Sequence, residues 1–223
     1  MAKDFCHPKV VAGYDEHIVQ LIPGYALMHA QVRATLTVQL TAEAHILVVG
    51  CGTGYEIEYL LADFPKIHIT AVDPSLNMLQ KAQQKIAEHA DSSRVNWLLG
   101  TTADLKPEAQ FDAALCLLVA HFIANDQKTE FFQQIYQHLK PKAYLMTYDM
   151  LLPSHANELK ILQHLCQVQG LSVRQSEQML ERLEDDFALI TPQQYCDTLL
   201  KVGFNSIQTY LQVINYFGFL AQK

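Results

Sequence analysis

A glycine-rich stretch in the first quarter of the chain has the composition of a ligand-binding loop. Gly50, Gly52 and Gly54 follow a short β-branched run and precede a segment expected to start a helix. Asp73 ends the next apolar run, nineteen residues after Gly54. Glycines allow a tight turn and a close ligand approach, and a carboxylate at the tip of the second strand accepts hydrogen bonds from ribose hydroxyls. The combination predicts a nucleotide site, whereas the glycines alone would also suit a plain strand-to-helix turn.

The loop differs from those that hold a diphosphate. Dinucleotide folds carry Gly-x-Gly-x-x-Gly, with the pyrophosphate at the helix N-terminus. Here the third glycine comes one position early, and Tyr55 and Glu56 occupy the helix start, where a carboxylate would repel a diphosphate. The loop also lacks the phosphate-binding lysine of P-loops. We therefore expect a ligand with a ribose but without phosphate.

These residues need a scaffold, and the apolar pattern around them predicts one. Short apolar runs alternate with amphipathic helical segments such as 74–87, in which Pro74 suits the first turn. Thr191, Pro192 and Gln194 form a helix start with a capping box. The alternation predicts an α/β fold, with a mostly parallel sheet and helices on both faces. The expected strands are residues 45–49, 67–72, 111–116 and 144–148, followed by a closing antiparallel pair at 206–213 and 215–221.

Outside this core the chain is expected to be helical. The N-terminal segment is interrupted by Pro23-Gly24, and the segment after the fourth of these runs is polar with two apolar stripes. A chain of 223 residues favours one large domain, 1–223, over two small ones. We divide it into an N-terminal helical segment (1–42), a core (43–152), a helical insertion (153–190) and a last helix with closing strands (191–223).

The composition excludes several classes of protein. Half of the residues are hydrophobic, too many for an intrinsically disordered chain. The net charge of −7 argues against non-specific nucleic-acid binding. No apolar run approaches the ~18–20 residues of a membrane helix, and the N-terminus has no apolar signal core, so we expect no membrane partner. Five cysteines without a Cys-x-x-Cys pair and ten histidines without paired spacing predict a cytoplasmic protein with reduced thiols and no metal site.

Four segments of the core carry motifs that are specific in combination. Residues 48–54, 72–75, 111–116 and 139–142 resemble four motifs of the class I S-adenosylmethionine-dependent methyltransferases. These are the first motif, the ribose-binding acidic turn, the fourth-strand motif and the turn before the fifth strand. The resemblance implies a Rossmann-like, seven-stranded sheet with an antiparallel last strand, and S-adenosylmethionine as cofactor. It implies cofactor contacts from Gly50, Cys51, Gly52, Gly54, Asp73, Pro74, Ser75, Met78, Thr101, Thr102 and Cys116.

Two positions depart from that family's pattern. The family usually has an acid two residues before the first glycine, where this chain has Val48. It also favours Asp after the third strand, where this chain has Thr101. A hydroxyl accepts a weaker hydrogen bond than a carboxylate from the adenine amino group. Weaker cofactor binding, a variant cofactor and Asp104 as a substitute carboxylate all stay open.

A narrower resemblance extends over nearly the whole chain. Its segments are similar to those of the carboxy-S-adenosylmethionine synthases of the tRNA wobble-uridine pathway. The resemblance places Tyr25 over the cofactor, where an aromatic face attracts a sulfonium; Tyr14 is expected to be structural. The matching segments are 22–25, 178–181, 201–204 and 214–218.

The arginine of those synthases is missing here. They remake the cofactor with prephenate, and an arginine before their Met-Leu-Glu sequence holds the added carboxylate. This chain has Gln178 there, with Glu177 beside it, and Arg174 three residues before Glu177. Glu177 would repel a carboxylate, so the resemblance implies the architecture rather than the reaction.

Candidates for proton transfer are residues that directly follow the strands, where ligands bind in such sheets. His121 comes five residues after Cys116 and is either a general base or a packed helix-start histidine. Tyr148 and Asp149 end the next parallel strand and face acceptor or solvent, with solvent favoured for Asp149. We expect a methyltransferase with His121 and Tyr148 as catalytic candidates and a small-molecule acceptor, while homodimerisation stays open. The alternatives are a cofactor-remodelling enzyme and a non-catalytic S-adenosylmethionine-binding protein.

Overall fold

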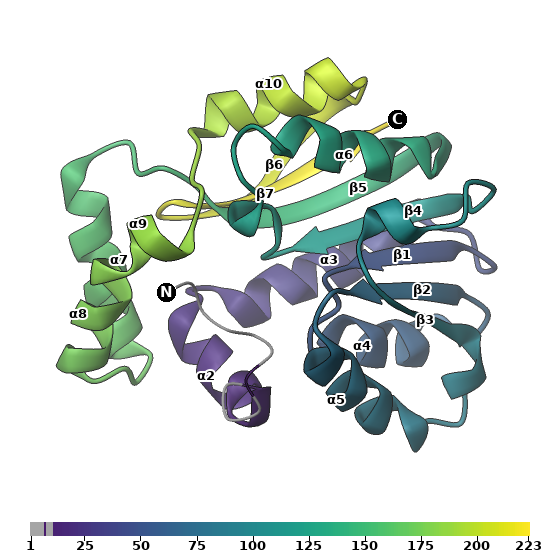
Figure 1. The fold of residues 1–223 in the computed structure, drawn as a ribbon, viewed down its shortest axis with the longest axis horizontal. Coiled ribbons are helices and arrows are strands. Elements are labelled where there is room, and N and C mark those ends of the chain that lie inside the picture. The colour runs from purple at the N-terminus through teal and green to yellow at the C-terminus, as the bar shows by residue number, and fades with distance from the viewer. Residues whose placement is uncertain (1–6, 8–10) are drawn as a thin grey trace.

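A seven-stranded sheet forms the centre of the molecule (Figure 1). The computed structural model describes residue 7 and residues 11–223; Cys6 and the start of the expected 1–42 segment lie outside the described residues. The first five strands pair in parallel and the last two pair antiparallel, which confirms the predicted sheet. In spatial order the strands are β3 (Val95–Leu99), β2 (His68–Asp73), β1 (His45–Val49), β4 (Phe111–Leu117), β5 (Leu139–Met150), β7 (Tyr216–Gln222) and β6 (Asn205–Val213).

Helices cover both faces of this sheet, as predicted. The α-helices of the described residues are α2 (Tyr14–Leu21), α3 (Tyr25–Gln39), α4 (Tyr55–Asp63), α5 (Leu76–Ala87), α6 (Lys128–Gln137), α7 (Ala156–Val168), α8 (Val173–Glu181), α9 (Leu183–Asp186) and α10 (Pro192–Val202). Buried side chains of α3, α4 and α5 pack on one face, and those of α6 and α10 on the other. Alternate residues of β1 serve the two cores, with Ile46 in one and Leu47 in the other, because successive strand side chains point to opposite faces. No helix in the described part of the chain is long and apolar enough to cross a membrane.

The start of α5 differs from the prediction. Pro74 was expected in the first turn, but the helix begins at Leu76 and Pro74 precedes its cap. Ser75 is the N-cap, and its hydroxyl accepts a hydrogen bond from the Met78 amide at 3.3 Å. A capping side chain satisfies an amide that the first turn leaves without a partner, which fixes the start of the helix.

Two strands also differ from the prediction. The fifth strand was expected at 144–148, but β5 extends over Leu139–Met150. Its first residues form an irregular pairing with β4, with a register shift and Lys142 at a φ of 66°. Strand β3 was not predicted; four of its five residues are apolar, but it is an edge strand in which only Val95 is buried. In contrast, the helix start at Thr191, Pro192 and Gln194 forms the predicted capping box.

Helix α2 and the inserted helices α7–α9 lie beyond the ends at which the parallel strands finish (Figure 1). Two side chains near the end of α7 attach the insertion to α2. The Cys166 thiol donates to the Leu21 carbonyl at 3.4 Å, and the Gln169 amide donates to the Val19 carbonyl at 3.0 Å. Since ligands of open α/β sheets bind beyond the carboxyl ends of the strands, these two segments form a wall of the site.

Candidate functional site

The glycine loop joins β1 to α4 in a conformation that favours glycine. Gly50 has a φ of 64°, and a side-chain Cβ there would lie 2.6 Å from the Val119 side chain. Gly52 has a φ of 51°, but a Cβ there would meet nothing within 4 Å. Gly50 is therefore required by packing, whereas Gly52 leaves open space beside the backbone for a ligand.

Asp73 connects this loop to the end of β2. One carboxylate oxygen accepts from the Gly52 amide at 2.8 Å and the other from the Ser75 amide at 2.8 Å. The side chain is buried, and burial raises the pKa of Asp73 although the two amides oppose the shift. A carboxylate offers about four lone pairs, so two amide bonds leave acceptor capacity for ribose hydroxyls.

A pocket of about 300 Å³ opens beside the loop. It brings together four of the predicted residues, Gly50, Pro74, Thr101 and Thr102, and is also lined by Val119. This pocket lies between the ends of β1, β2 and β3 and the helix α6, next to Asp73. Its walls are mostly apolar with a polar threonine edge, which suits a flat heterocycle.

The two threonine hydroxyls at this edge have different partners. The Thr101 hydroxyl donates to the Asp104 carboxylate at 3.2 Å, and that carboxylate also accepts from the Thr101 amide at 2.8 Å. The Thr102 hydroxyl donates to Gln134 at 2.7 Å. Thr101 thus lines the pocket itself, while Asp104, the open alternative, caps the 3₁₀ turn Thr102–Asp104.

The other predicted cofactor residues do not line this pocket. Ser75 and Met78 form the start of α5, and the Cys51 and Cys116 thiols are buried, which raises their pKa values. Tyr25 lies in an aromatic group, 4.4 Å from the His29 ring and 5.6 Å from the Tyr55 ring between centroids.

Helix α2 is attached to the glycine loop from outside the sheet. The Thr53 hydroxyl donates to Asp15, which forms ion pairs of 3.3 Å with both Lys81 and Lys85 on α5. Next to it on the helix, Tyr14 is half-buried, and its raised pKa reflects desolvation of the hydroxyl together with the nearby carboxylates. Sequence reasoning missed Asp15, for which the Tyr-Asp pair at the helix start was the available signal.

His121 belongs to a buried polar group on the other side of the site. Its Nδ1 atom lies 2.9 Å from Asp149 Oδ1, and its backbone amide donates to the same oxygen at 3.2 Å. The Tyr195 hydroxyl donates to the second Asp149 oxygen at 2.7 Å. The expectation that Asp149 faces solvent is wrong, because the side chain is 1% exposed. Lys128 holds the 3₁₀ turn Ala120–Phe122 by donating to the Ala120 and Ile123 carbonyls at 2.6 Å each.

Tyr148 does not belong to the polar group around His121. Its hydroxyl donates to the Pro23 carbonyl at 3.2 Å, and its ring stacks on Tyr216 at 5.7 Å. The side chain is fully buried, which raises the pKa of its hydroxyl. The structure therefore separates Tyr148 from His121, although the two were predicted together.

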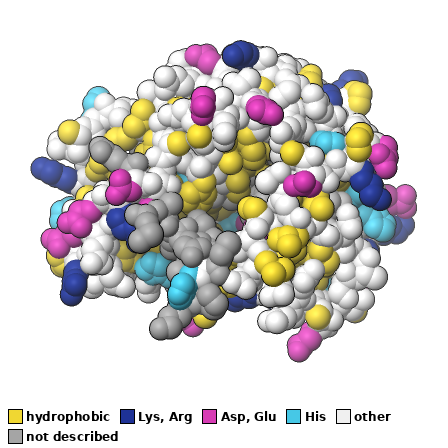
Figure 2. All heavy atoms as spheres, in the orientation of Figure 1, with side chains coloured by type: hydrophobic (Ala, Val, Ile, Leu, Met, Phe, Trp, Pro, Cys, Tyr) yellow, Lys and Arg dark blue, Asp and Glu magenta, His cyan; other side chains and the backbone are white. Residues whose placement is uncertain are grey.

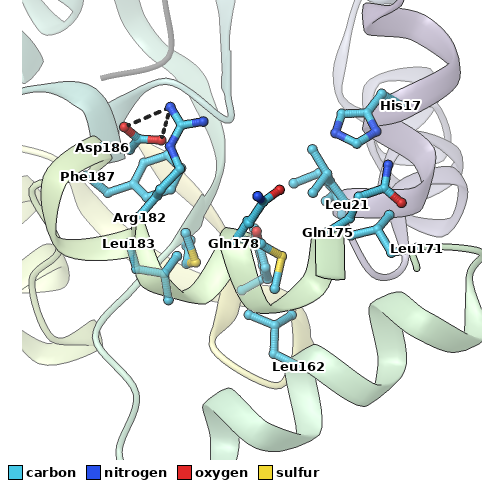
Figure 3. Close-up of a pocket in the computed structure, with 14 residues that line it drawn as sticks. His17, Leu21, Leu162, Leu171, Gln175, Gln178, Arg182, Leu183, Asp186 and Phe187 are labelled. Carbon is cyan, nitrogen blue, oxygen red and sulfur yellow. Dashed lines mark hydrogen bonds and ion pairs between the residues drawn. The ribbon is translucent and has the colours of Figure 1, made fainter. Parts of the chain in front are cut away.

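A second pocket, of about 220 Å³, lies among α2, α7–α9 and β5 (Figure 3). Polar groups at its surface come from His17, Gln175 and Gln178, together with Arg182, which forms an ion pair of 3.1 Å with Asp186. Figure 2 shows hydrophobic side chains gathered toward the middle of the face on which the insertion and α2 meet the sheet. The remaining lining is apolar: Leu21, Ile22, Met150, Leu162, Leu171, Met179, Leu183, Phe187 and Tyr216.

Phe187 links this pocket to His121. Its ring packs against the His121 ring at 5.0 Å and against Phe122 at 5.2 Å, and it also lines the pocket. Arg174, the cation three residues before Glu177, is exposed and does not line the pocket, and Glu177 is exposed as well. In the described residues, no group of three or more His, Cys, Asp or Glu side chains is arranged to hold a metal ion.

Comparisons with known proteins agree with this geometry. Residues 47–145 match the family described as "Methyltransferase domain". The chain is 31% identical over 121 residues to the malonyl-[acyl-carrier protein] O-methyltransferase of Priestia megaterium, which covers 54% of this chain and 42% of that enzyme. It is 25% identical over 232 residues to the carboxy-S-adenosyl-L-methionine synthase of Desulfotalea psychrophila, covering 100% and 93% of the two chains.

A solved structure has the same fold. The 1,6-didemethyltoxoflavin-N1-methyltransferase of Burkholderia thailandensis, with its substrate and S-adenosylhomocysteine bound, superposes with a TM-score of 0.60 at 18% identity, covering 88% of this chain and 78% of that one. At this identity the likeness shows the fold alone. The chain spans less than half the length of the Priestia enzyme.

The sheet order, the glycine loop after β1 and the carboxylate at the end of β2 define a Rossmann-like nucleotide-binding fold. Within that class, the domain match over residues 47–145 and the relatives support a class I S-adenosylmethionine-dependent methyltransferase. S-adenosylmethionine is the cofactor of this class.

Proposed function

We propose that the protein transfers the methyl group of S-adenosylmethionine to a small, mostly apolar acceptor. The observation that carries this proposal is the open space beside Gly52, whose amide donates to Asp73. The pocket at Thr101 opens beside the same loop, at Gly50. In this assignment Asp73 holds the ribose, and the pocket edge at Thr101 and Thr102 holds the adenine. The other proposed contacts are those predicted from sequence: Tyr25, Gly50, Cys51, Gly54, Pro74, Ser75, Met78 and Cys116.

His121 is the proposed base. The cofactor supplies an electrophilic methyl group on a sulfonium, and attack by an acceptor oxygen or nitrogen leaves a proton to be removed. Asp149 lies at Nδ1 of His121, which leaves Nε2 to accept that proton, and a buried carboxylate stabilises the imidazolium that forms. Tyr148 is the weaker candidate, because its hydroxyl already donates to Pro23.

The acceptor pocket is proposed to be the one that Figure 3 shows. Its apolar lining favours an apolar body, and the Gln175 and Gln178 amides offer neutral hydrogen bonds. Asp186 neutralises the charge of Arg182 there, so a strongly anionic acceptor gains little. Phe187 places this pocket beside His121.

The second candidate is a carboxylating enzyme, which the whole-chain relatives favour. Against it stands the pocket itself, where Gln178 replaces the expected arginine and Arg182 is bound to Asp186. Incubation with S-adenosylmethionine and prephenate, followed by mass spectrometry, separates the two candidates. We expect no carboxylated cofactor, and its appearance would overturn methyl transfer to an acceptor.

Binding and turnover test the proposal itself. We expect the protein to bind S-adenosylmethionine and to release S-adenosylhomocysteine when a panel of small hydroxylated and aminated aromatic compounds is supplied. A deuterated methyl group appearing on an acceptor in mass spectrometry identifies the substrate. Binding without any transfer would instead favour the non-catalytic alternative.

We also propose that this single-domain protein works in the cytoplasm, either alone or as a homodimer. The four described cysteines, Cys51, Cys116, Cys166 and Cys196, are free thiols, which suits a reducing compartment. Thiol titration of freshly lysed cells and light scattering of the purified protein test these two points.

A further inference from the structure

The first turn of α4, directly after the glycine loop, carries a largely buried carboxyl group. Glu56 comes two residues after Gly54, and its side chain is 14% exposed. Tyr14 and Cys51 each interact electrostatically with both Glu56 and Asp73. Glu56 and Asp73 therefore both lie near Cys51 of the glycine loop and near Tyr14.

This carboxyl group lacks a strong counter-charge. Among the described residues, no Lys or Arg forms an ion pair with Glu56, and the nearest basic atom is His29 Nε2 at 3.9 Å. His29 is 2% exposed, and its Nε2 atom has no hydrogen-bond partner. Burial lowers the pKa of His29 to about 3, so this imidazole is neutral.

Aromatic rings surround the same place. The rings of Tyr25 and Tyr55 lie 5.6 Å apart, and each packs on His29 at 4.4 and 4.6 Å. Ring faces carry negative potential and attract a desolvated cation. Glu56 is largely buried next to these rings and lies 3.9 Å from an imidazole nitrogen that has no hydrogen-bond partner. This environment favours binding of a positively charged group.

We propose that Glu56 is the counter-ion for the methionine end of S-adenosylmethionine, which carries a sulfonium, an ammonium and a carboxylate group and is positively charged overall. This inference rests on the proposed function, since it needs the cofactor to bind at the glycine loop. It makes Glu56 a binding residue and His29 a positioning residue, and sequence reasoning assigned neither.

The burial of Glu56 makes cofactor binding depend on pH. Burial raises the pKa of Glu56 to about 7, against the lowering effects of its own backbone amide and Lys85. A bound cation favours the ionised carboxylate, so binding releases a proton and weakens as the pH falls. With a pKa near 7, affinity should drop roughly tenfold between pH 8 and pH 6. The ionisable groups around Glu56 are Tyr14, Asp15, Tyr25, His29, Cys51, Tyr55, Tyr59, Asp73 and Lys85.

Titration calorimetry of the unaltered protein tests this directly. At pH 7, S-adenosylmethionine is added in two buffers that differ in protonation enthalpy, and the difference in heat gives the protons released. We expect about half a proton per cofactor. No release, or proton uptake, would overturn the proposal. A parallel titration with S-adenosylhomocysteine, which keeps the ammonium but has no sulfonium, assigns the pairing to one group or the other.

A matched pair of variants provides the second test. We expect Glu56→Gln to weaken binding roughly tenfold or more at pH 8 and to remove the pH dependence relative to the unaltered protein. The ratio of the two proteins' affinities at each pH cancels the effect of the ligand's own titration. Glu58→Gln, an exposed acid of the same helical turn, should change neither property. Equal effects of both variants would overturn the role of Glu56, whereas a protein that binds no cofactor at all would instead overturn the proposed function.

Discussion

The two sides of the site are built in different ways. On the cofactor side, the contacts come from loops at the ends of neighbouring strands, and Asp73 holds them through backbone amides at Gly52 and Ser75. On the acceptor side, the wall is made by side chains from α2 and from α7–α9, which are separated by more than a hundred residues (Figure 1). Backbone contacts tolerate little change, whereas side chains can be exchanged. In the proposed assignment, the first side therefore sets the class of cofactor and the second sets the acceptor.

The largest loss of turnover is expected for a change at Asp149, which lies between the two sides. Asp149→Asn removes the charge beside His121 Nδ1 and should lower kcat by roughly 10²–10⁴. Affinity for S-adenosylhomocysteine should stay unchanged, because Asp149 lies outside the glycine loop. The measurement is turnover against pH with the acceptor found in the deuterium assay. Tyr195→Phe is the control, since it removes only the 2.7 Å hydrogen bond to Asp149 and should cost less. Unchanged turnover in Asp149→Asn would remove His121 as the base.

Two glycines of the cofactor side should respond differently to alanine. Gly50→Ala combines left-handed backbone strain with a contact to Val119, so it should lower the free energy of unfolding by roughly 2–4 kcal/mol. Gly52→Ala carries the strain alone, roughly 1–2 kcal/mol, but should block S-adenosylhomocysteine. Urea unfolding and calorimetry measure the two quantities. Normal binding by a folded Gly52→Ala protein would show that the open space does not receive the ligand.

A smaller effect is expected at the charged pair of the acceptor side. Because Asp186 binds Arg182, the protein should prefer S-adenosylmethionine to its carboxylated form by roughly tenfold or more. Asp186→Asn releases Arg182 and should narrow that preference. Competition between the two compounds, followed by mass spectrometry of the bound fraction, measures it. A preference for the carboxylated form would make this site resemble the synthases instead.

Sequence reasoning found the glycine loop and the position of Asp73 because their signals are local. The glycine spacing, Asp73 and the capping box at Thr191 each lie within a few residues, and the closing hairpin follows from two adjacent runs. Asp149 was misplaced because its burial depends on Tyr195 and His121, which lie 46 and 28 residues away along the chain. Strand β3 was not predicted, although four of its five residues are apolar. The second pocket could not be predicted from local patterns, because its walls come from α2 and α8, which are far apart in the sequence.

The central claim is that the loop at Gly52 and the carboxylate of Asp73 bind S-adenosylmethionine. Titration calorimetry with S-adenosylhomocysteine, on the unaltered protein and on Asp73→Ala, tests it most directly. We expect one site per chain, and a loss of roughly tenfold or more in affinity for the variant, because charged hydrogen bonds to ribose contribute roughly 1.5–3 kcal/mol. Circular dichroism serves as the control for folding. Absence of binding by the unaltered protein, or equal affinity in the folded variant, would contradict the claim.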